Sequence, residues 1–252
     1  MRELYQQEVI LGKQISVYLP PSYREENNST RFQVVYLQDG MDLVSQVFNL
    51  LNHKFRTKEL PELIFVGIEP TNRSHEYTPW PAPSLRGTAF PGFDGKGAEY
   101  IAYITDTLKP HIDHTYRTLI EPEHTGILGA SLGGLISLYA GYLRPDVFGK
   151  IGALSASLWY ESMLSFIETS PLSIHRAKLF LSVGSLEGVY KENIQRHMVT
   201  YTVQAHALFL EKGMNSDQLK FVLEEGGTHD DYFFAKQFLG ALHWMFASPK
   251  EE

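Results

Sequence analysis

One serine lies at the centre of the pentapeptide Gly129-Ala-Ser131-Leu-Gly133, between a short apolar run and a run with helical spacing. Residues 124–128 predict a buried strand, and the apolar positions of 134–143 predict a helix. The small neighbours of Ser131 permit a tight strand-to-helix turn that exposes its hydroxyl beside the first helical N–H groups. A helix start with small residues for close packing is the alternative interpretation. The pattern therefore predicts a nucleophilic serine next to an oxyanion site.

A serine alcohol needs a general base within hydrogen-bond reach, and His229 has a suitable position. It follows the predicted last strand, 219–224, through Glu225-Gly-Gly-Thr228, and the two glycines permit a sharp loop. The other histidines precede Ser131, fall before or within a predicted helix, or lie deep in the terminal helix. A histidine on a surface loop is the alternative. We expect His229 to be the base.

An acid must orient that base, and Glu187 is our candidate. It follows the predicted strand 178–183 through Gly184-Ser-Leu, at the sheet edge expected to carry the serine and the histidine. Glu192, Asp230 and Asp231 are rivals. The two aspartates could instead cap the terminal helix, a frequent position for aspartate.

The oxyanion site needs two backbone N–H groups. The N–H of Leu132 follows the serine directly. The second is predicted at Met41, in the turn Asp39-Gly40-Met41 after the strand 32–38, since Gly40 lets the backbone approach closely. Taken alone, Asp39-Gly40 is also an ordinary turn dipeptide.

Strand-like and helix-like segments alternate along the chain, which predicts an α/β fold with a mostly parallel sheet and helices on both faces. The first two strands, joined at Gly12-Lys13, are expected to be antiparallel. No repeat or change of composition divides residues 1–252, so we expect one domain. Strands are predicted at 4–10, 14–19, 32–38, 63–68, 124–128, 151–155, 178–183 and 219–224. Helices are predicted at 43–55, 97–115, 132–143, 190–213 and 231–246.

The segment 70–96 is a long loop with five prolines, three glycines and the aromatic residues Tyr77, Trp80, Phe90 and Phe93. It follows a predicted strand and should emerge at the carboxyl edge of the sheet, where open α/β folds bind ligands. We interpret it as a wall or lid of a substrate pocket. A loop that is merely packed against the surface is the alternative.

Composition excludes several function classes. A net charge of −7 and the lack of a long basic run argue against a nucleic-acid partner. The chain contains no cysteine, so disulfides and a cysteine nucleophile are excluded. Residues 1–8 lack the apolar region of a signal peptide, and no apolar run is long enough for a membrane span. We therefore expect a cytoplasmic protein that needs no metal and no cofactor and acts on a small molecule.

These motifs, in this order, resemble the putative-esterase family of α/β-hydrolases, which contains enterochelin-type siderophore esterases, esterase D-like enzymes, feruloyl esterases and mycolyltransferases. The resemblance covers most of the chain. The matching segments are Tyr36-Leu-Gln-Asp-Gly40, Glu76-Tyr-Thr-Pro-Trp80, Tyr116-Arg-Thr118, Gly129-Ala-Ser-Leu-Gly-Gly134, Ser155-Ala-Ser-Leu-Trp159, Val183-Gly-Ser-Leu-Glu187 and Gly226-Gly-Thr-His229.

The resemblance implies an α/β-hydrolase fold and a serine esterase with Ser131, His229 and Glu187 as its triad, nearest to the siderophore-esterase branch. It implies substrate contacts at the positions Asp39, Gly40, Tyr77, Trp80 and Trp159. Positive charge for an anionic substrate could come from Arg73, Arg86 and Lys96. Acyl transfer, cleavage of feruloyl or sugar esters, thioester cleavage and a catalytically silent binding protein are the alternatives.

Overall fold

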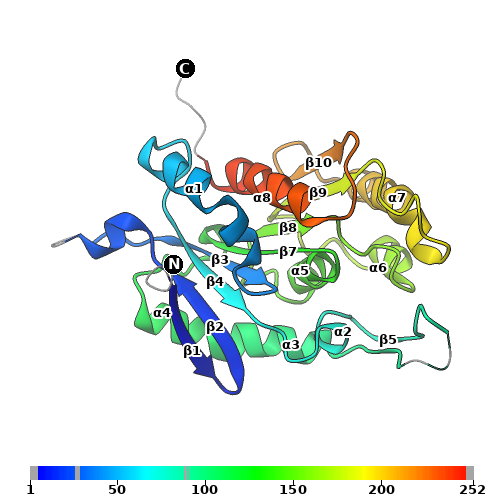
Figure 1. The fold of residues 1–252 in the computed structure, drawn as a ribbon, viewed down its shortest axis with the longest axis horizontal. Coiled ribbons are helices and arrows are strands. Elements are labelled where there is room, and N and C mark those ends of the chain that lie inside the picture. Colours follow the sequence, from blue (N-terminus) through cyan, green and yellow to red (C-terminus); the bar gives the residue numbers. More distant parts are fainter. Residues whose placement is uncertain (1–4, 26–28, 88, 90, 248–252) are drawn as a thin grey trace.

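The computed structural model describes residues 5–25, 29–87, 89 and 91–247. Within this part of the chain, an eight-stranded sheet has the order β1-β2-β4-β3-β7-β8-β9-β10 (Figure 1). Strands β4, β3, β7, β8, β9 and β10 are parallel, and β2 is antiparallel to both of its neighbours, β4 and β1. Their bounds are β1 Tyr5–Ile10, β2 Lys13–Tyr18, β3 Gln33–Gln38, β4 Leu63–Ile68, β7 Thr125–Ala130, β8 Lys150–Leu154, β9 Lys178–Gly184 and β10 Leu219–Glu224.

The predicted antiparallel start of the sheet is confirmed. A two-residue turn joins β1 to β2, and both of its residues have positive φ, 45° at Leu11 and 86° at Gly12. Hairpin turns of this kind match the right-handed twist of the strands that they connect. The predicted first strand also included Leu4, which lies outside the described residues.

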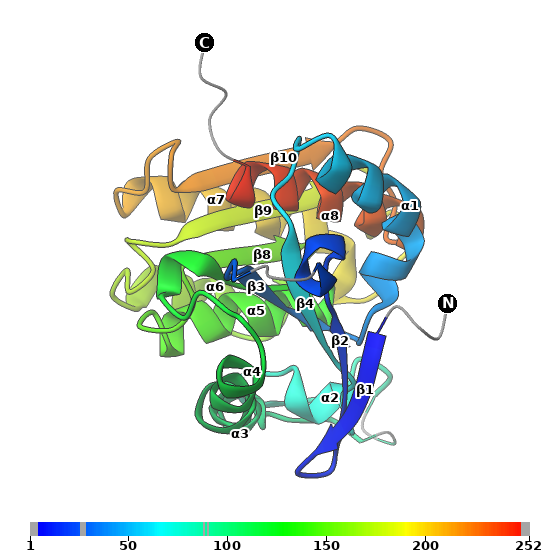
Figure 2. The same ribbon diagram turned by 90° about the vertical axis from the view of Figure 1, so that its left-hand side faces the viewer.

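Helices cover both faces of the sheet, as predicted (Figures 1 and 2). Helices α1 and α8 contact each other on one face, and α5 packs on β7 and β8 from the other. The helices are α1 Asp42–Arg56, α2 Arg73–Glu76, α3 Gly97–Tyr103, α4 Lys109–Thr115, α5 Leu132–Leu143, α6 Met163–Thr169, α7 Met198–Glu211 and α8 Asp231–Phe246. Among the described residues, no helix combines the length and the apolarity needed to cross a bilayer.

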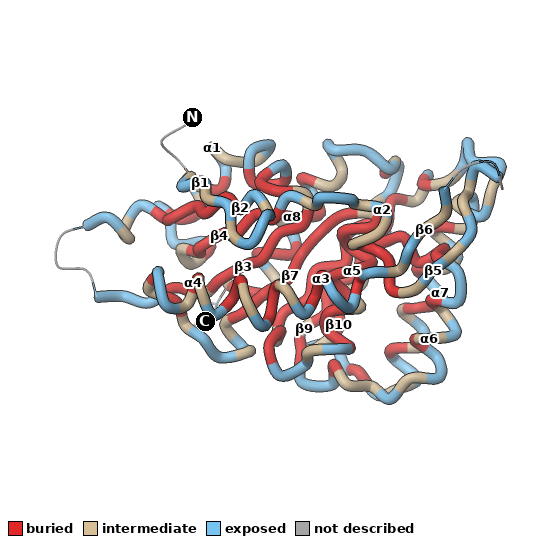
Figure 3. Tube along the Cα trace, turned by 90° about the horizontal axis from the view of Figure 1, so that it is seen from below, coloured by how far each residue is buried: buried red, intermediate tan, exposed pale blue. Residues whose placement is uncertain are grey.

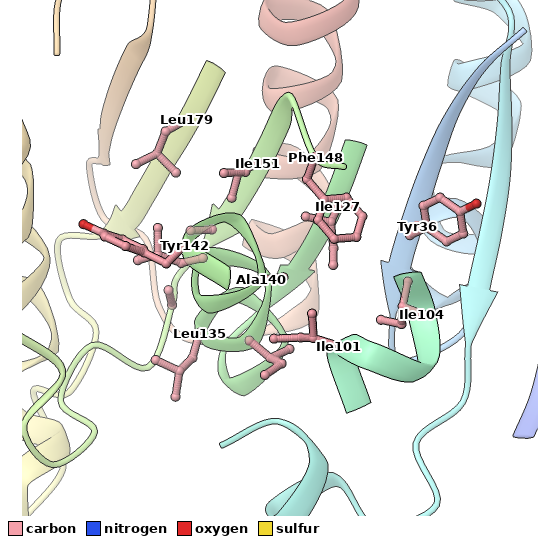
Figure 4. Close-up of a cluster of buried hydrophobic side chains, with 14 of the residues drawn as sticks. Tyr36, Ile101, Ile104, Ile127, Leu135, Ala140, Tyr142, Phe148, Ile151 and Leu179 are labelled. Carbon is pink, nitrogen blue, oxygen red and sulfur yellow. The ribbon is translucent and has the colours of Figure 1, made fainter. Parts of the chain in front are cut away.

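Two apolar cores fill the space between the sheet and its helices, and the buried trace follows the central strands and α5 (Figure 3). Helix α5 contributes Leu135 and Ala140 to one core, where they lie with Ile127 of β7, Ile151 of β8 and Ile101 of α3 (Figure 4). Because α5 begins directly after Ser131, this packing fixes the position of the serine relative to the sheet.

Three differences from the predicted elements have local causes. The helix predicted at 190–213 begins only at Met198, after a 3-10 helix at Ile194–His197 that is capped by the Asn193 side chain. Helix α6 was not predicted. The segment 97–115 is helical throughout but contains a π-helical turn at Ile104–Leu108. This turn ends two positions before Pro110, which has no N–H to donate.

The segment 70–96 contains helix α2 and a short antiparallel pair, β5 Pro81–Ala82 and β6 Phe93–Asp94. The part with β5 and β6 extends past α2 to the periphery of the molecule (Figures 1 and 3). Phe90 lies outside the described residues.

Candidate active site

Ser131 lies in a strained turn between β7 and α5. Its backbone has φ 59° and ψ −122°, a conformation that costs a residue with a side chain about 1–3 kcal/mol. Two hydrogen bonds to neighbouring strand ends hold the turn: the Ser131 N–H donates to Leu154 O, and the Ser157 N–H donates to Ser131 O, both at 3.0 Å. The strain is thus maintained by the sheet, and the hydroxyl is directed outward at its carboxyl edge.

The glycines around Ser131 are required by close backbone contacts. A Cβ atom added to Gly129 would lie 2.6 Å from the carbonyl carbon of Gly133. One added to Gly133 would lie 2.9 Å from Gln38 Cβ. The small residues of the pentapeptide therefore let the helix start approach both its own strand and β3.

His229 lies in the loop between β10 and α8 and reaches the serine. Its Nε2 is 3.0 Å from Ser131 Oγ, and its side chain is 32% exposed. The Phe234 ring packs edge-on against the imidazole, with centroids 4.9 Å apart. Ser131 and His229 are 98 positions apart in the sequence, so the sheet is what brings them together.

The Glu187 carboxylate lies behind the imidazole, with Oε2 2.7 Å from His229 Nδ1. Its side chain is completely buried. Because an ionised carboxylate only accepts hydrogen bonds, the Nδ1 atom must carry the proton, which leaves Nε2 to accept from the serine hydroxyl. This arrangement can withdraw the serine proton and stabilise the imidazolium that results.

The second oxygen of Glu187 is held by two donors. Oε1 accepts from the Gly184 N–H at 2.7 Å and from the Ser155 hydroxyl at 2.5 Å. Ser155 Oγ also lies 3.0 Å from Gln237 Oε1. The same Gln237 oxygen accepts from the Ser182 hydroxyl at 3.0 Å, so the amide lies between two buried serines beside the acid. Gln237 and Ser155 were not predicted, because nothing in their sequence context marks them as neighbours of the acid.

The three rival acids lie elsewhere. Asp230 caps helix α8 by accepting from the N–H of Tyr232, and Asp231 begins the first turn of that helix. Glu192 is exposed on the loop after Glu187. Of the four candidate acids, Glu187 is the one whose carboxylate contacts the His229 ring.

The two predicted oxyanion donors lie on segments that touch. Met41 directly precedes α1 and Leu132 begins α5, and N–H groups at helix starts have no partner within their own helix. A Cβ atom added to Gly133 would come within 3.3 Å of Asp39 Oδ2, which shows how closely the two segments pack. The turn itself needs a glycine at position 40. Gly40 has φ 64°, and a Cβ atom added to it would lie 1.9 Å from Glu69 Oε1.

Arg73 ties these two segments together, a role that the sequence did not reveal. Its guanidinium makes two bonds to the Asp39 carboxylate, at 2.7 and 3.0 Å, and a third at 3.3 Å to Ala130 O, beside Ser131. Burial acts to lower the pKa of Arg73, but the hydrogen bonds and charge of Asp39 outweigh it, so the pKa is raised. Asp39 and Arg73, expected near substrate, are thus bound to each other.

A cleft of about 910 Å³ opens beside Ser131 and Leu132 and is lined partly by the segment 70–96. Trp159 lines it, as expected for a substrate contact. Two other expected contacts are placed differently. Tyr77 is fully buried and accepts from the Asp39 N–H at 2.9 Å. Trp80 donates to Glu161 O at 2.8 Å and packs on the Phe166 ring, so it anchors the segment.

The model of the Esterase family, described as "Putative esterase", matches residues 12–245. The chain belongs to this esterase family. The esterase is 44% identical over 235 residues to the protein YbbA of Bacillus subtilis (strain 168), and the match covers 93% of each chain. It is 23% identical over 221 residues to a siderophore enterobactin esterase of Emericella nidulans, covering 81% of this chain and 73% of the relative.

Among solved structures, the esterase is similar to an IroE-like serine hydrolase from Shewanella oneidensis, with a TM-score of 0.79 and 21% identity. The similarity covers 95% of this chain and 79% of that chain, and it confirms the predicted α/β-hydrolase fold. Membership of this family makes the protein an esterase, an enzyme that acts on small-molecule esters.

Proposed function

We propose that this esterase works through an acyl-enzyme on Ser131, with His229 as general base and Glu187 as the acid that orients it. The observation that carries the proposal is the continuous chain of hydrogen bonds from Ser131 Oγ to His229, at 3.0 Å, and on to the buried Glu187, at 2.7 Å. The chain begins at a strained serine and ends at a carboxylate with two further donors.

The reaction proceeds in two steps of the same kind. Ser131 Oγ attacks the ester carbonyl while His229 Nε2 takes the hydroxyl proton, and the same proton then passes to the departing alcohol. Water attacks the acyl-serine with His229 again as base, and the carboxylic acid leaves. The N–H groups of Met41 and Leu132 stabilise the oxyanion of both tetrahedral intermediates, and Arg73 holds their two segments in register.

If an acyl-enzyme forms, its acyl group is transferred either to water or to an added alcohol. The ratio of the two products then does not depend on the leaving group of the ester. We expect phenyl acetate and p-nitrophenyl acetate, in the presence of methanol, to give the same ratio of methyl acetate to acetic acid. Product analysis by gas chromatography measures it. Ratios that differ between the two esters would exclude a common acyl-enzyme, whereas methyl acetate in large excess would favour acyl transfer as the natural reaction.

We further propose an anionic, multiply substituted lactone of the siderophore type as substrate. Among the described residues that line the cleft, the ionisable side chains are all basic: Arg73, His75, Arg86 and Lys191. Arg86 and Lys191 are exposed and come from opposite segments, so they can face a large anion from two sides. The Emericella nidulans relative, named as a siderophore enterobactin esterase, supports this substrate class.

The double replacement Arg86→Gln with Lys191→Gln tests the charge of the cleft. We expect it to lower kcat/KM for enterobactin about 10-fold or more relative to p-nitrophenyl butyrate in the same variant, because two charge-assisted contacts are lost. Chromatography of the linear hydrolysis products measures the rate on enterobactin. The matched control replaces Lys58 and Lys220, which are exposed outside the cleft. An unchanged ratio in the double variant would argue against an anionic substrate.

A further inference from the structure

A second pocket, of about 430 Å³, adjoins the cleft and differs from it in chemistry. Its walls come from the segment 70–96, from the residues after Ser157, from helix α6, and from Ile194 and Tyr201 at the start of α7 and just before it. The lining side chains are mostly apolar or aromatic, and Glu161 is the one charged residue among those that line it within the described part of the chain. Pockets of this volume are ordinary for small-molecule groups.

The pocket is continuous with the cleft. Ser84, Leu85, Phe93 and Trp159 line both volumes, so a ligand can extend from one to the other. The path from the serine is short, because Ser157 Oγ lies 3.4 Å from Ser131 Oγ and the next residue, Leu158, already lines the pocket.

The floor of the pocket is buried, and its rim is open to solvent. Leu158, Trp159, Tyr160 and Met163 have at most 6% of their surface exposed. The Phe93 ring packs against Tyr160 at 5.4 Å and against Trp159 at 6.4 Å, which fixes one wall. At the opening, Ile194 is 38% exposed, and Leu164 and Tyr201 are half-buried. A preformed apolar cavity with an open mouth favours an apolar, ring-sized group over a charged one.

We propose that this pocket, lined by Leu158, Trp159, Met163 and Leu164, is a specificity subsite that binds an apolar aromatic group of the ester while the carbonyl lies at Ser131. The inference rests on the proposed function, because it needs the ester at Ser131. It assigns the choice of substrate to two separate regions: the basic cleft recognises charge, and the pocket recognises an apolar ring.

The test uses three esters without a chromophore and follows acid release at constant pH. Ethyl acetate is the reference, ethyl 3-phenylpropanoate carries a ring on the acyl side, and 2-phenylethyl acetate carries one on the alcohol side. We expect kcat/KM for at least one phenyl ester to exceed that for ethyl acetate about 10-fold or more. A hydrophobic pocket discriminates by about this factor between substrates that differ by a single methylene, and a phenyl ring is larger. Leu164→Trp, which fills the pocket, is expected to remove this preference.

The control Thr169→Trp adds the same ring at an exposed position of α6 that lies outside the pocket and on another face of the helix from Leu164, and it is expected to keep the preference. Ile194→Trp at the rim serves as a second filling variant, should Leu164→Trp fail to fold in a thermal melt. Equal rates on all three esters, or a preference that survives both filling variants, would overturn the subsite. Failure of the wild-type protein to hydrolyse any ester would instead overturn the proposed function.

Discussion

Replacing Ser131 with alanine is expected to lower kcat for ester hydrolysis by about 10⁶-fold, because without its Oγ no acyl-enzyme can form and His229 has no proton to withdraw. The remaining rate should come from substrate binding and from the N–H groups at the start of α5. Turnover of p-nitrophenyl acetate measures the loss, and a thermal melt of the variant verifies folding. Removing the hydroxyl from a strained turn leaves the packing of the glycines around it intact.

Ser157→Ala is the matched control for this experiment. Its hydroxyl lies 3.4 Å from Ser131 Oγ, so it is the nearest alternative alcohol in the site. We expect its loss to change kcat by no more than several-fold. If Ser157→Ala abolished turnover while Ser131→Ala retained it, the assignment of the nucleophile would be reversed.

The second large effect is expected for Glu187→Gln, with a loss of about 10⁴-fold in kcat. A glutamine can keep its oxygen toward the Gly184 N–H and the Ser155 hydroxyl, which donate to Oε1 at 2.7 and 2.5 Å. Its NH₂ group then faces His229 Nδ1. That group can only donate, so the imidazole proton moves to Nε2, where it can no longer accept from Ser131. The variant should therefore fold normally and turn over slowly.

The rival acids provide the controls for Glu187→Gln. Glu192→Gln alters an exposed side chain and is expected to be fully active. Asp230→Asn keeps a side chain that can cap α8, so we expect near-normal stability and activity. Full activity of Glu187→Gln together with inactivity of either control would show that the acid had been misassigned.

Much of this geometry was predictable because it depends on local patterns. Strand β4 and helices α5 and α8 have the predicted bounds, since each is a clear apolar run with a sharp stop. Ser131, His229 and Glu187 could be found from their positions after successive strands, because carboxyl ends of parallel strands meet at one edge of a sheet.

The parts that could not be predicted depend on contacts between distant segments. Arg73 meets Asp39 across 34 positions, and Ser155 meets Gln237 across 82, and no local pattern encodes either pair. Tyr77 and Trp80 have the composition of a binding loop, yet their rings are used to anchor it. Aromatic content predicts burial, but it does not distinguish packing against the protein from packing against a ligand.

The most direct measurement of the central claim is covalent labelling with a fluorophosphonate, followed by intact mass and peptide mapping. The proposed mechanism predicts one adduct per chain, located on the peptide that contains Ser131, formed in the wild-type protein and absent from Ser131→Ala. It also predicts much slower labelling of a His229→Ala variant, which lacks the base. An adduct on another residue, or a folded protein with active esterase turnover and no adduct, would contradict Ser131 as the nucleophile.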